Sequence, residues 1–315
     1  MDFITLEQIH QILPSLDLVT EIEKGFMAYS HGRVVVPPIG EMILDSGEVH
    51  IKYGYIKGDE YYVIKIASGF YEDSASDKMT GNGMMMLFSQ KSGEPVCALL
   101  DEGHLTNIRT AVAGAIVAKH LAPSRVDKIG IVGAGTQGRL QLTHLKEIVS
   151  CRNVLVWGTG SEELALYKSD MENEGFEVET TQDPAEIQHR CNLIVTTTPS
   201  KGPILMTDKL RKGTHITAMG SDTTEKQELD PNILKNAYLV VADSIEQCMA
   251  RGEIFKAIEA GQLEKNGVAE LGQIISGKVQ GRVSQDQITI ADLTGVAVQD
   301  INIASAVYQA FIKRK

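Results

Sequence analysis

The sequence predicts an α/β protein in which a doubly wound parallel sheet is joined to a smaller, mainly antiparallel α+β part. From Asp127 onward, apolar runs of strand length alternate with helical runs, which is typical of a parallel sheet covered by helices. The preceding part of the chain instead shows alternating hydrophobicity and short turns. A glycine-rich turn links the apolar run 129–132 to an amphipathic segment, as at the start of a nucleotide-binding unit.

The composition is that of a globular protein of about two domains. With 315 residues and 43% hydrophobic content, the chain can bury a substantial core. The formal net charge of −11, without a basic cluster, disfavours nucleic acid as a partner. No apolar run reaches membrane-spanning length, and the first residues lack the pattern of a signal peptide, so we expect no membrane association.

The cysteines and histidines predict neither disulfides nor a metal site. The four cysteines are scattered without C-x-x-C spacing, and the eight histidines show no metal-ligand spacing. Unpaired cysteines fit a reducing compartment. We therefore expect a cytoplasmic protein that holds no metal.

The first part of the chain is predicted to form an antiparallel sheet preceded by a helix. An alternating pattern from Glu48 to Phe70, interrupted by a charged turn at 57–60, predicts a β-hairpin. The alanine-rich stretch 105–121 is apolar on nearly all sides and predicts a buried helix that joins the two parts. The other elements predicted here are a helix over 5–31, interrupted by Pro14, and strands over 84–88 and 96–100.

The second part is predicted to form the parallel sheet. Because ligands bind at the carboxyl ends of parallel strands, the loops after Val132, Trp157, Thr196 and Met219 should line a site. The last stretch, 290–315, is predicted to continue as a helix that packs on the first part of the chain. The predicted strands are 129–132, 154–157, 191–196, 215–219 and 239–241, with a helix over 161–175.

The turn after the strand 129–132 has the G-x-G-x-x-G spacing of a dinucleotide-binding turn. Gly133 permits the tight turn, Gly135 lets a pyrophosphate approach the backbone, and Gly138 lets the helix pack close to the strand. The helix start offers free N–H groups to the phosphates. Strand, turn and helix follow in the required order, so we expect a nicotinamide or flavin cofactor here.

Two cations lie in unusual surroundings. Lys65 interrupts an apolar strand, where it either faces solvent or binds a substrate carboxylate. Arg109 lies in the apolar helix 105–121, where an unpaired charge would be costly. A bound carboxylate or pyrophosphate could pair Arg109, and so could a structural Asp or Glu; we favour a functional role.

Asp222 and Thr159 follow predicted strands at the ligand-binding edge. Asp222 could move a proton or hold a substrate amine, or it could cap a helix that begins after it. The strand before Thr159 usually ends in an acid for NAD or an arginine for NADP. Neither is present before Glu162, so the choice between NAD and NADP stays open.

Taken together, these segments resemble the ornithine cyclodeaminase/μ-crystallin family over nearly the whole chain. The motifs are Lys65 on its strand, LTNIRTAVAGAIVAKHLAP, GAGTQG, TTTP, GSDTTEKQEL and the late DLTGVAVQD. The resemblance implies a Rossmann-like NAD(P)-binding domain over 121–293. It also implies a discontinuous domain over 1–120 and 294–315, which would bind a small amino or imino acid and form a homodimer.

The resemblance implies roles for single residues. Lys65 and Asp222 resemble catalytic residues, with Asp222 as the acid/base. Lys65 and Arg109 resemble the residues that bind the substrate carboxylate, and Arg109 also resembles one that faces the cofactor phosphate. The implied cofactor contacts, including those of the glycine turn and Thr159, are Thr80, Arg109, Gly133, Ala134, Gly135, Thr136, Gln137, Gly138, Thr159, Thr198, Met219, Gly220, Ser221, Lys226, Thr294 and Gly295.

The sequence departs from the family pattern before Lys65. A second carboxylate-binding arginine is expected there, but the stretch VVVPPIGEMIL has none, and Glu41 stands near the expected place. Arg33 and Lys52 are possible substitutes. An acid at this point would repel a substrate carboxylate and attract an amine.

We therefore expect an NAD(P)-dependent oxidoreductase that acts on the C–N bond of a small amino or imino acid. It would be a ketimine or imino-acid reductase or an amino-acid dehydrogenase. The first alternative is an ornithine cyclodeaminase, which forms proline and ammonia and recycles its cofactor. The second is a non-catalytic NAD(P)-binding protein, which the presence of Asp222 and Lys65 disfavours.

Overall fold

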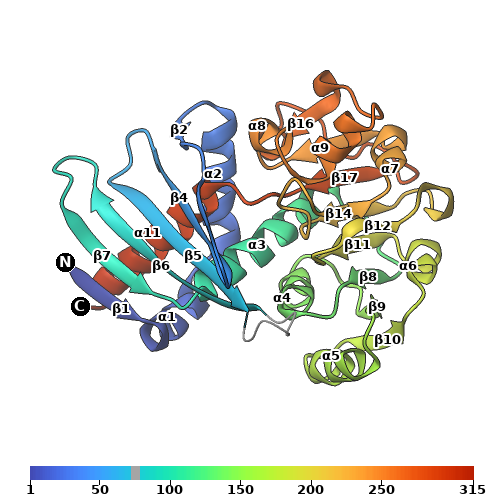
Figure 1. The fold of residues 1–315 in the computed structure, drawn as a ribbon, viewed down its shortest axis with the longest axis horizontal. Coiled ribbons are helices and arrows are strands. Elements are labelled where there is room, and N and C mark those ends of the chain that lie inside the picture. The colour runs from blue at the N-terminus through green and yellow to red at the C-terminus, as the bar shows by residue number, and fades with distance from the viewer. Residues whose placement is uncertain (72–78) are drawn as a thin grey trace. The chain divides into compact units, whose positions relative to one another are not determined.

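The computed structural model describes residues 1–71 and 79–315, with side chains described for 1–70 and 81–315. Two compact units make up this part of the chain (Figure 1). Unit 1 consists of Met1–Arg109 and Ala297–Lys315, and unit 2 of Thr110–Val296. The division falls inside helix α3 (His104–Leu121), whereas the sequence places it at the end of this helix.

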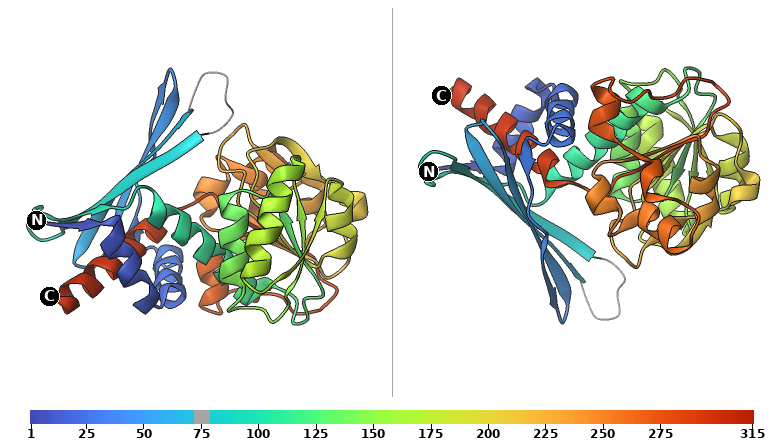
Figure 2. Two further views of the ribbon diagram at one scale, coloured as in Figure 1. Left: turned by 90° about the horizontal axis from the view of Figure 1, so that it is seen from below. Right: turned by 90° about the horizontal axis from the view of Figure 1, so that it is seen from above.

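Unit 1 is a twisted sheet with helices packed on one face (Figure 2). Its strand order is β1-β7-β6-β5-β4-β2, with β3 paired to β4. Strands β1 and β7 are parallel, and the other pairs are antiparallel. The strands are β1 (Asp2–Thr5), β2 (Val34–Val35), β3 (Gly40–Leu44), β4 (Gly47–Ile56), β5 (Tyr61–Tyr71), β6 (Met79–Ser89) and β7 (Pro95–Leu100).

The predicted hairpin is present as β4 and β5, and the predicted helix over 5–31 is broken near Pro14. It forms α1 (Leu6–Ile12), a 3-10 turn at Leu13–Ser15 and α2 (Leu18–Ser30). The C-terminal helix α11 (Ala297–Arg314) packs against α2, β4 and β5. The two chain ends meet, since Lys315 Nζ lies 2.6 Å from Asp2 Oδ1. The first strand and the last helix of the chain therefore both belong to unit 1 and lie in contact.

Unit 2 is a doubly wound sheet with helices on both faces (Figure 2). Its strands pair in parallel, in the order β10-β9-β8-β11-β13-β17-β15-β16. The order reverses at β8, so the carboxyl ends of β8 and β11 flank the switch point where such folds bind ligands. The predicted α/β class is thereby confirmed.

The bounds in unit 2 agree closely with the longer predicted elements. The sheet strands are β8 (Ile129–Val132), β9 (Asn153–Trp157), β10 (Glu177–Thr181), β11 (Leu193–Thr196), β13 (His215–Ala218), β15 (Leu239–Ala242), β16 (Val268–Glu270) and β17 (Thr289–Asp292). A separate pair is formed by β12 (Lys201–Leu205) and β14 (Gln227–Leu229). The helices are α4 (Thr136–Leu145), α5 (Ser161–Asn173), α6 (Pro184–Arg190), α7 (Pro231–Asn236), α8 (Ile245–Cys248), α9 (Gly252–Glu259) and α10 (Leu271–Ile275).

Apolar cores lie on both faces of the unit 2 sheet. Along β11, Leu193 and Val195 belong to one buried cluster, while Ile194 belongs to the other. This alternation explains why the central strands are continuous apolar runs, because both of their faces are covered. Within the described residues, no helix is long and apolar enough to cross a membrane.

Candidate functional site

The glycine turn forms an open cradle at the start of α4. Gly133 has φ +111°, a conformation that favours glycine, and a Cβ there would lie 2.8 Å from Thr197 Oγ1. A Cβ on Gly138 would lie 2.1 Å from the Gly133 carbonyl oxygen. By contrast, a Cβ on Gly135 would meet nothing within 4 Å.

Gly135 is the N-cap of α4, and no side chain caps the helix there. The ten-residue helix thus presents its first N–H groups without a side-chain acceptor. Arg139 supports the turn from within α4. It donates to the Ala134 and Gly135 carbonyls, and its Nε lies 2.8 Å from Asp170 Oδ2. A fixed turn with open space over its second glycine fits a pyrophosphate.

The end of β9 carries no charged side chain of its own. Gln182 Nε2 donates to the Thr159 carbonyl at 2.7 Å, and Trp157 Nε1 donates to the Gln182 carbonyl at 3.1 Å. Gly160 is the N-cap of α5, again without a side-chain cap, and Glu162 lies in the first turn. The acids nearest to Thr159 in the chain, Glu162 and Glu163, come from the first turn of α5 and not from the strand end, so the choice between NAD and NADP stays open.

Asp222 follows β13 in an extended loop and is not a helix cap. No helix begins there, since the next one after it in the chain is α7. The capping alternative is therefore wrong. Lys226 Nζ lies 2.7 Å from Asp222 Oδ1, and Ser221 Oγ donates to the Lys226 carbonyl at 2.7 Å. The Asp222 side chain stays 48% exposed, so a ligand can reach it.

Three other segments predicted to contact the cofactor lie at the carboxyl ends of neighbouring strands. Thr198 follows β11, Met219 and Gly220 follow β13, and Thr294 follows β17. Met219 Sδ lies 2.6 Å from Gln141 Nε2 of α4. Thr294 Oγ1 accepts from Gln247 Nε2 at 2.8 Å. The sheet thus brings these segments to one edge, as predicted for parallel strands.

In unit 1, Lys65 and Arg109 share one buried carboxylate. Lys65 Nζ lies 3.2 Å from Asp300 Oδ2, and Arg109 Nε lies 3.0 Å from Asp300 Oδ1. Gln299 accepts from Arg109 Nη1 at 2.8 Å. Lys65 is only 2% exposed, so the solvent-facing alternative is wrong. Lys65 points to the face of the sheet that the helices cover. Strand alternation could not predict this, because it assigns residues to two faces without showing which face is covered.

The charges in this cluster strongly affect one another. Burial lowers the pKa of Lys65 to about 7, against the opposing effect of Asp300. Burial also disfavours the ionised form of Asp300, but Arg109 and Lys65 together hold its pKa below the usual value. Lys52 lies opposite Lys65 on the neighbouring strand and also lowers both pKa values. Asp300 therefore remains a carboxylate that draws two cations together.

Glu41 lies on β3 and contacts a histidine. His50 Nδ1 lies 3.3 Å from Glu41 Oε1, and His50 Nε2 lies 3.4 Å from Glu48 Oε1. His50 is two residues from Lys52 on β4, and so on the same face of the sheet. The predicted contact at Thr80 lies outside the residues whose side chains are described.

Sequence reasoning missed three buried acceptors: Gln299, Asp300 and Glu228. The first two lie within the quoted DLTGVAVQD segment, and Glu228 lies within GSDTTEKQEL. A polar residue inside an otherwise apolar helical run, such as Asp300 after VAV, was the signal available. Among the residues with described side chains, no group of three or more His, Cys, Asp or Glu could hold a metal ion.

The model of the ornithine cyclodeaminase/mu-crystallin family matches residues 1–315. The chain belongs to this family. It is 39% identical to "Uncharacterized cyclodeaminase y4tK" of Sinorhizobium fredii, over 98% of this chain and 95% of that protein. It is 33% identical to alanine dehydrogenase of Archaeoglobus fulgidus, over 97% and 94%. It is 31% identical to Delta(1)-pyrroline-2-carboxylate reductase of Bacillus cereus, over 91% and 89%.

Solved structures of the same family have the same fold. An archaeal alanine dehydrogenase dimer with bound NAD superposes with a TM-score of 0.90 at 29% identity, covering 100% of this chain and 97% of that one. The iminosuccinate reductase of Paracoccus denitrificans, in complex with NAD+, gives 0.88 at 27% identity over 100% and 97%. The relatives are thus oxidoreductases of amino and imino acids together with a cyclodeaminase.

Gly138 and Gly135 predict different effects of substitution by alanine, one on stability and one on NADH binding. Gly138→Ala should lower the free energy of unfolding by about 1–3 kcal/mol, because its Cβ collides with the backbone of the turn. Gly135→Ala should leave stability nearly unchanged and weaken NADH binding, because its Cβ enters only the open space over the turn. Urea unfolding and NADH fluorescence titration measure the two effects. An unchanged NADH affinity in Gly135→Ala would contradict the pyrophosphate cradle.

Proposed function

We propose that the protein is an NAD(P)-dependent oxidoreductase acting on the C–N bond of a small amino or imino acid. The observation that carries the proposal is the uncapped, open glycine turn at Gly135, in a chain whose full-length relatives include alanine dehydrogenase and pyrroline-2-carboxylate reductase. The free N–H groups of α4 would bind the pyrophosphate. The bound cofactor supplies or accepts the hydride.

The carboxylate of the substrate is held in unit 1. Lys65 and Arg109 are both buried, and among the described residues each is paired with the carboxylate of Asp300. Asp300 fixes the positions of the two cations, and their remaining N–H donors suit a planar carboxylate. A buried cation pair of this kind binds an anion strongly because little water competes for it.

Asp222 moves the proton of the substrate amine. Its carboxylate is accessible, and the ion pair with Lys226 holds its orientation. In the direction of reduction the imine nitrogen gains a proton, and in the direction of oxidation the amine loses one. Each transfer needs a group that can both give and accept, which a positioned carboxyl provides.

Ornithine cyclodeamination is the second candidate, and the 39% identical relative named a cyclodeaminase supports it. The two reactions differ in net redox change. A reductase consumes NADH or NADPH with pyrroline-2-carboxylate or iminosuccinate. A cyclodeaminase releases ammonia from ornithine without net change at 340 nm. A panel of imino and amino acids with both cofactors decides between them, and cofactor binding without any turnover would refute both.

Asp222→Asn should lower kcat by about 10²–10⁴-fold while leaving NADH affinity unchanged, since the amide oxygen can still accept from Lys226 Nζ but the amide cannot transfer the proton. Asp230→Asn is the matched control, because Asp230 caps α7 and accepts from Asn232 N at 2.8 Å. The control should turn over at the wild-type rate. Turnover within about twofold of wild type in Asp222→Asn would sink the assigned role.

The buried Lys65 predicts a pH dependence of substrate binding. The ammonium holds a carboxylate and the neutral amine does not, so KM for the imino acid should rise as the pH passes about 7. The same pKa shift makes the stability of the fold depend on pH, but in the opposite direction to substrate binding. Between pH values of about 7 and 10.5, Lys65 in the unfolded chain keeps a proton that it has lost in the folded chain, so the contribution of Lys65 to stability grows with pH.

Steady-state kinetics between about pH 6 and 9 at saturating NADH test this dependence. Lys65→Met should raise KM most at about pH 6, where the wild-type ammonium is intact, and its KM should meet the wild-type value near about pH 9, because no ammonium is left to titrate. A wild-type KM that stays constant across this range would contradict the role of Lys65.

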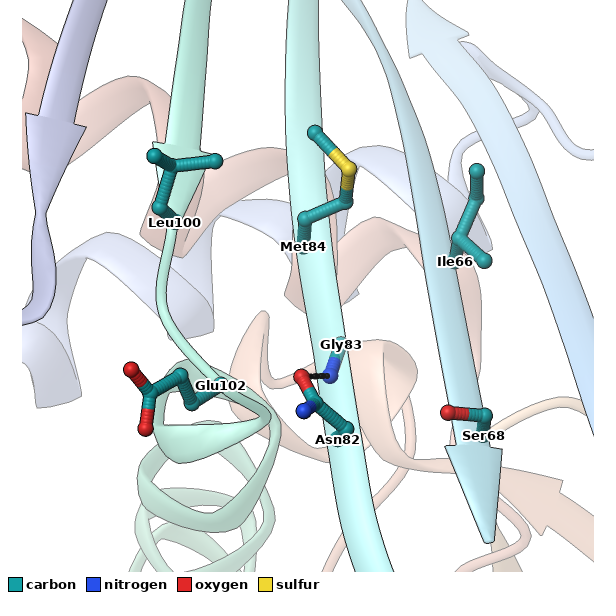
Figure 3. Close-up of a pocket in the computed structure, with 7 residues that line it drawn as sticks. All are labelled: Ile66, Ser68, Asn82, Gly83, Met84, Leu100 and Glu102. Carbon is teal, nitrogen blue, oxygen red and sulfur yellow. Dashed lines mark hydrogen bonds between the residues drawn. The ribbon is translucent and has the colours of Figure 1, made fainter.

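We further propose that the protein is a homodimer formed through the uncovered face of the unit 1 sheet. Register places Phe3, Ala98, Met86, Ile64 and Tyr53 in one row across five strands. Phe3 is 60% and Tyr53 37% exposed. Next to this row, Ile66, Met84 and Leu100 line a hollow of about 330 Å³ on the same face (Figure 3). An apolar sheet face of this kind suits a second copy, and the archaeal relative is a dimer.

Light scattering should therefore give twice the chain mass for the wild type and a single chain mass for Met86→Glu. Leu166→Glu is the control, because Leu166 is an exposed apolar residue of α5 in unit 2. A monomeric wild type, or a dimer that Met86→Glu leaves intact, would refute this interface.

A further inference from the structure

Glu228 is a buried carboxylate that joins two strand ends in unit 2. Its Oε1 accepts from Thr198 N at 2.6 Å and from Thr198 Oγ1 at 2.8 Å. Its Oε2 accepts from Thr196 Oγ1 at 2.6 Å and from Gly220 N at 2.9 Å. The donors come from the ends of β11 and β13, whereas Glu228 itself lies on β14. One side chain therefore fixes two loops that leave the sheet.

Gly220 is required for this arrangement. A Cβ at Gly220 would lie 2.2 Å from the Thr198 carbonyl oxygen and 2.7 Å from Glu228 Cδ. The two loops approach so closely that no side chain fits between them. The absence of a side chain at position 220 lets one carboxylate reach the backbone of both loops.

A second buried acid, Glu253, fixes the backbone of Glu228. Glu253 on α9 accepts from Glu228 N at 2.6 Å and from Leu229 N at 3.2 Å. The loop from Gly220 to Lys226 is closed by the contacts of Ser221 and Asp222 with Lys226. The catalytic candidate Asp222 thus lies in a loop whose start is anchored by Glu228.

We propose that Glu228 is a positioning residue for the nicotinamide end of the cofactor and for Asp222. This inference rests on the proposed function. Glu228 is 0% exposed, so it acts only through the loops that carry Thr198 and Gly220–Asp222. Its carboxylate accepts only from Thr196, Thr198 and Gly220 among the described residues, and not from the glycine turn, which would hold the phosphates. The hydroxyl of Thr197, which donates to the Gly133 carbonyl at 3.3 Å, makes that contact without Glu228. Because Asp222 would act beside the carbon that exchanges hydride, its loop would face the nicotinamide. A change at Glu228 should therefore weaken binding of the nicotinamide end and leave binding of the ADP end almost unchanged.

Glu228→Gln replaces one acceptor oxygen with an NH₂ group of the same size. Whichever way the amide turns, one backbone N–H, of Thr198 or of Gly220, then faces a donor. The threonine hydroxyls can rotate away, but the backbone N–H cannot. The loop that loses its partner should shift, and the nicotinamide should lose contacts that the adenine half keeps.

The test compares NADH with ADP-ribose, which lacks the nicotinamide, in titrations of the full chain. In Glu228→Gln the Kd of NADH should rise at least about fivefold, the equivalent of one lost buried hydrogen bond. The Kd of ADP-ribose should change by less than about twofold. The kcat should also fall, because Asp222 is displaced together with its loop.

His215→Gln is the control for general destabilisation. His215 is fully buried at the start of β13, where its ring nitrogens lie 2.8 Å from Thr289 Oγ1 and 3.0 Å from Thr217 Oγ1. This variant should lower Tm while leaving the ratio of the two Kd values at the wild-type value. If it changed that ratio as much as Glu228→Gln does, the effect would be general and the inference would fail.

Thr196→Val provides a milder version if Glu228→Gln does not fold. It removes one donor to Glu228 without placing two donors together, so it should shift the ratio in the same direction by a smaller factor. A ratio unchanged from wild type in the folded variants overturns the positioning role. Failure of the wild type to bind either ligand would instead refute the proposed function.

Discussion

The ion cluster around Asp300 is the interaction on which unit 1 depends. Its carboxylate comes from the C-terminal helix α11, while Lys65 comes from the middle of the sheet and Arg109 from α3. Loss of one partner would leave a buried charge without a counterion, which typically costs about 3–5 kcal/mol. This is a large share of the total stability of about 5–15 kcal/mol that a domain has. The positions of Lys65 and Arg109 therefore depend on the packing of α11 against the sheet.

Buried carboxylates also fix distant segments in unit 2, where they accept from backbone N–H groups and not from cations. Loops that leave parallel strands carry N–H groups that the sheet does not satisfy. Asp243 accepts from Gly295 N, in the loop after β17, at 2.7 Å. Asp292 likewise accepts from Ile254 N, an N–H in the first turn of α9, at 2.8 Å. Burial raises the pKa of Glu253 to about 8, which shows how strongly this interior opposes ionisation. Buried acids thus fix the edge at which the cofactor segments meet.

The groups proposed to bind the substrate carboxylate and the turn proposed to bind the cofactor belong to different units of the chain. The glycine turn is built almost entirely from backbone, so it would serve any dinucleotide. The groups that would select a substrate, Lys65 and Arg109 with Glu41 nearby on β3, belong to unit 1.

Much of the candidate site could be predicted because its signals are local. The strand–turn–helix order around Gly133 to Gly138 is contained in a few residues, and the structure has it in that form. Lys65 and Asp222 could be named, but their surroundings could not. Alternation gave two faces for Lys65 without saying which one the helices cover. Asp222 preceded a polar run that could have begun a helix, but no helix begins there.

The sequence by itself determined the α/β class, the parallel and antiparallel parts, and the glycine turn, because each depends on periodicity or on residues close together in the chain. Only the tertiary structure decided the counterion of Lys65 and Arg109 and the role of Glu228. Asp300 reaches the two cations by the return of α11, and Glu228 reaches Thr198 and Gly220 through the pairing of β12 with β14 beside the main sheet. Such partners are set by packing between distant segments, and a sequence pattern carries no record of which distant segment will lie opposite.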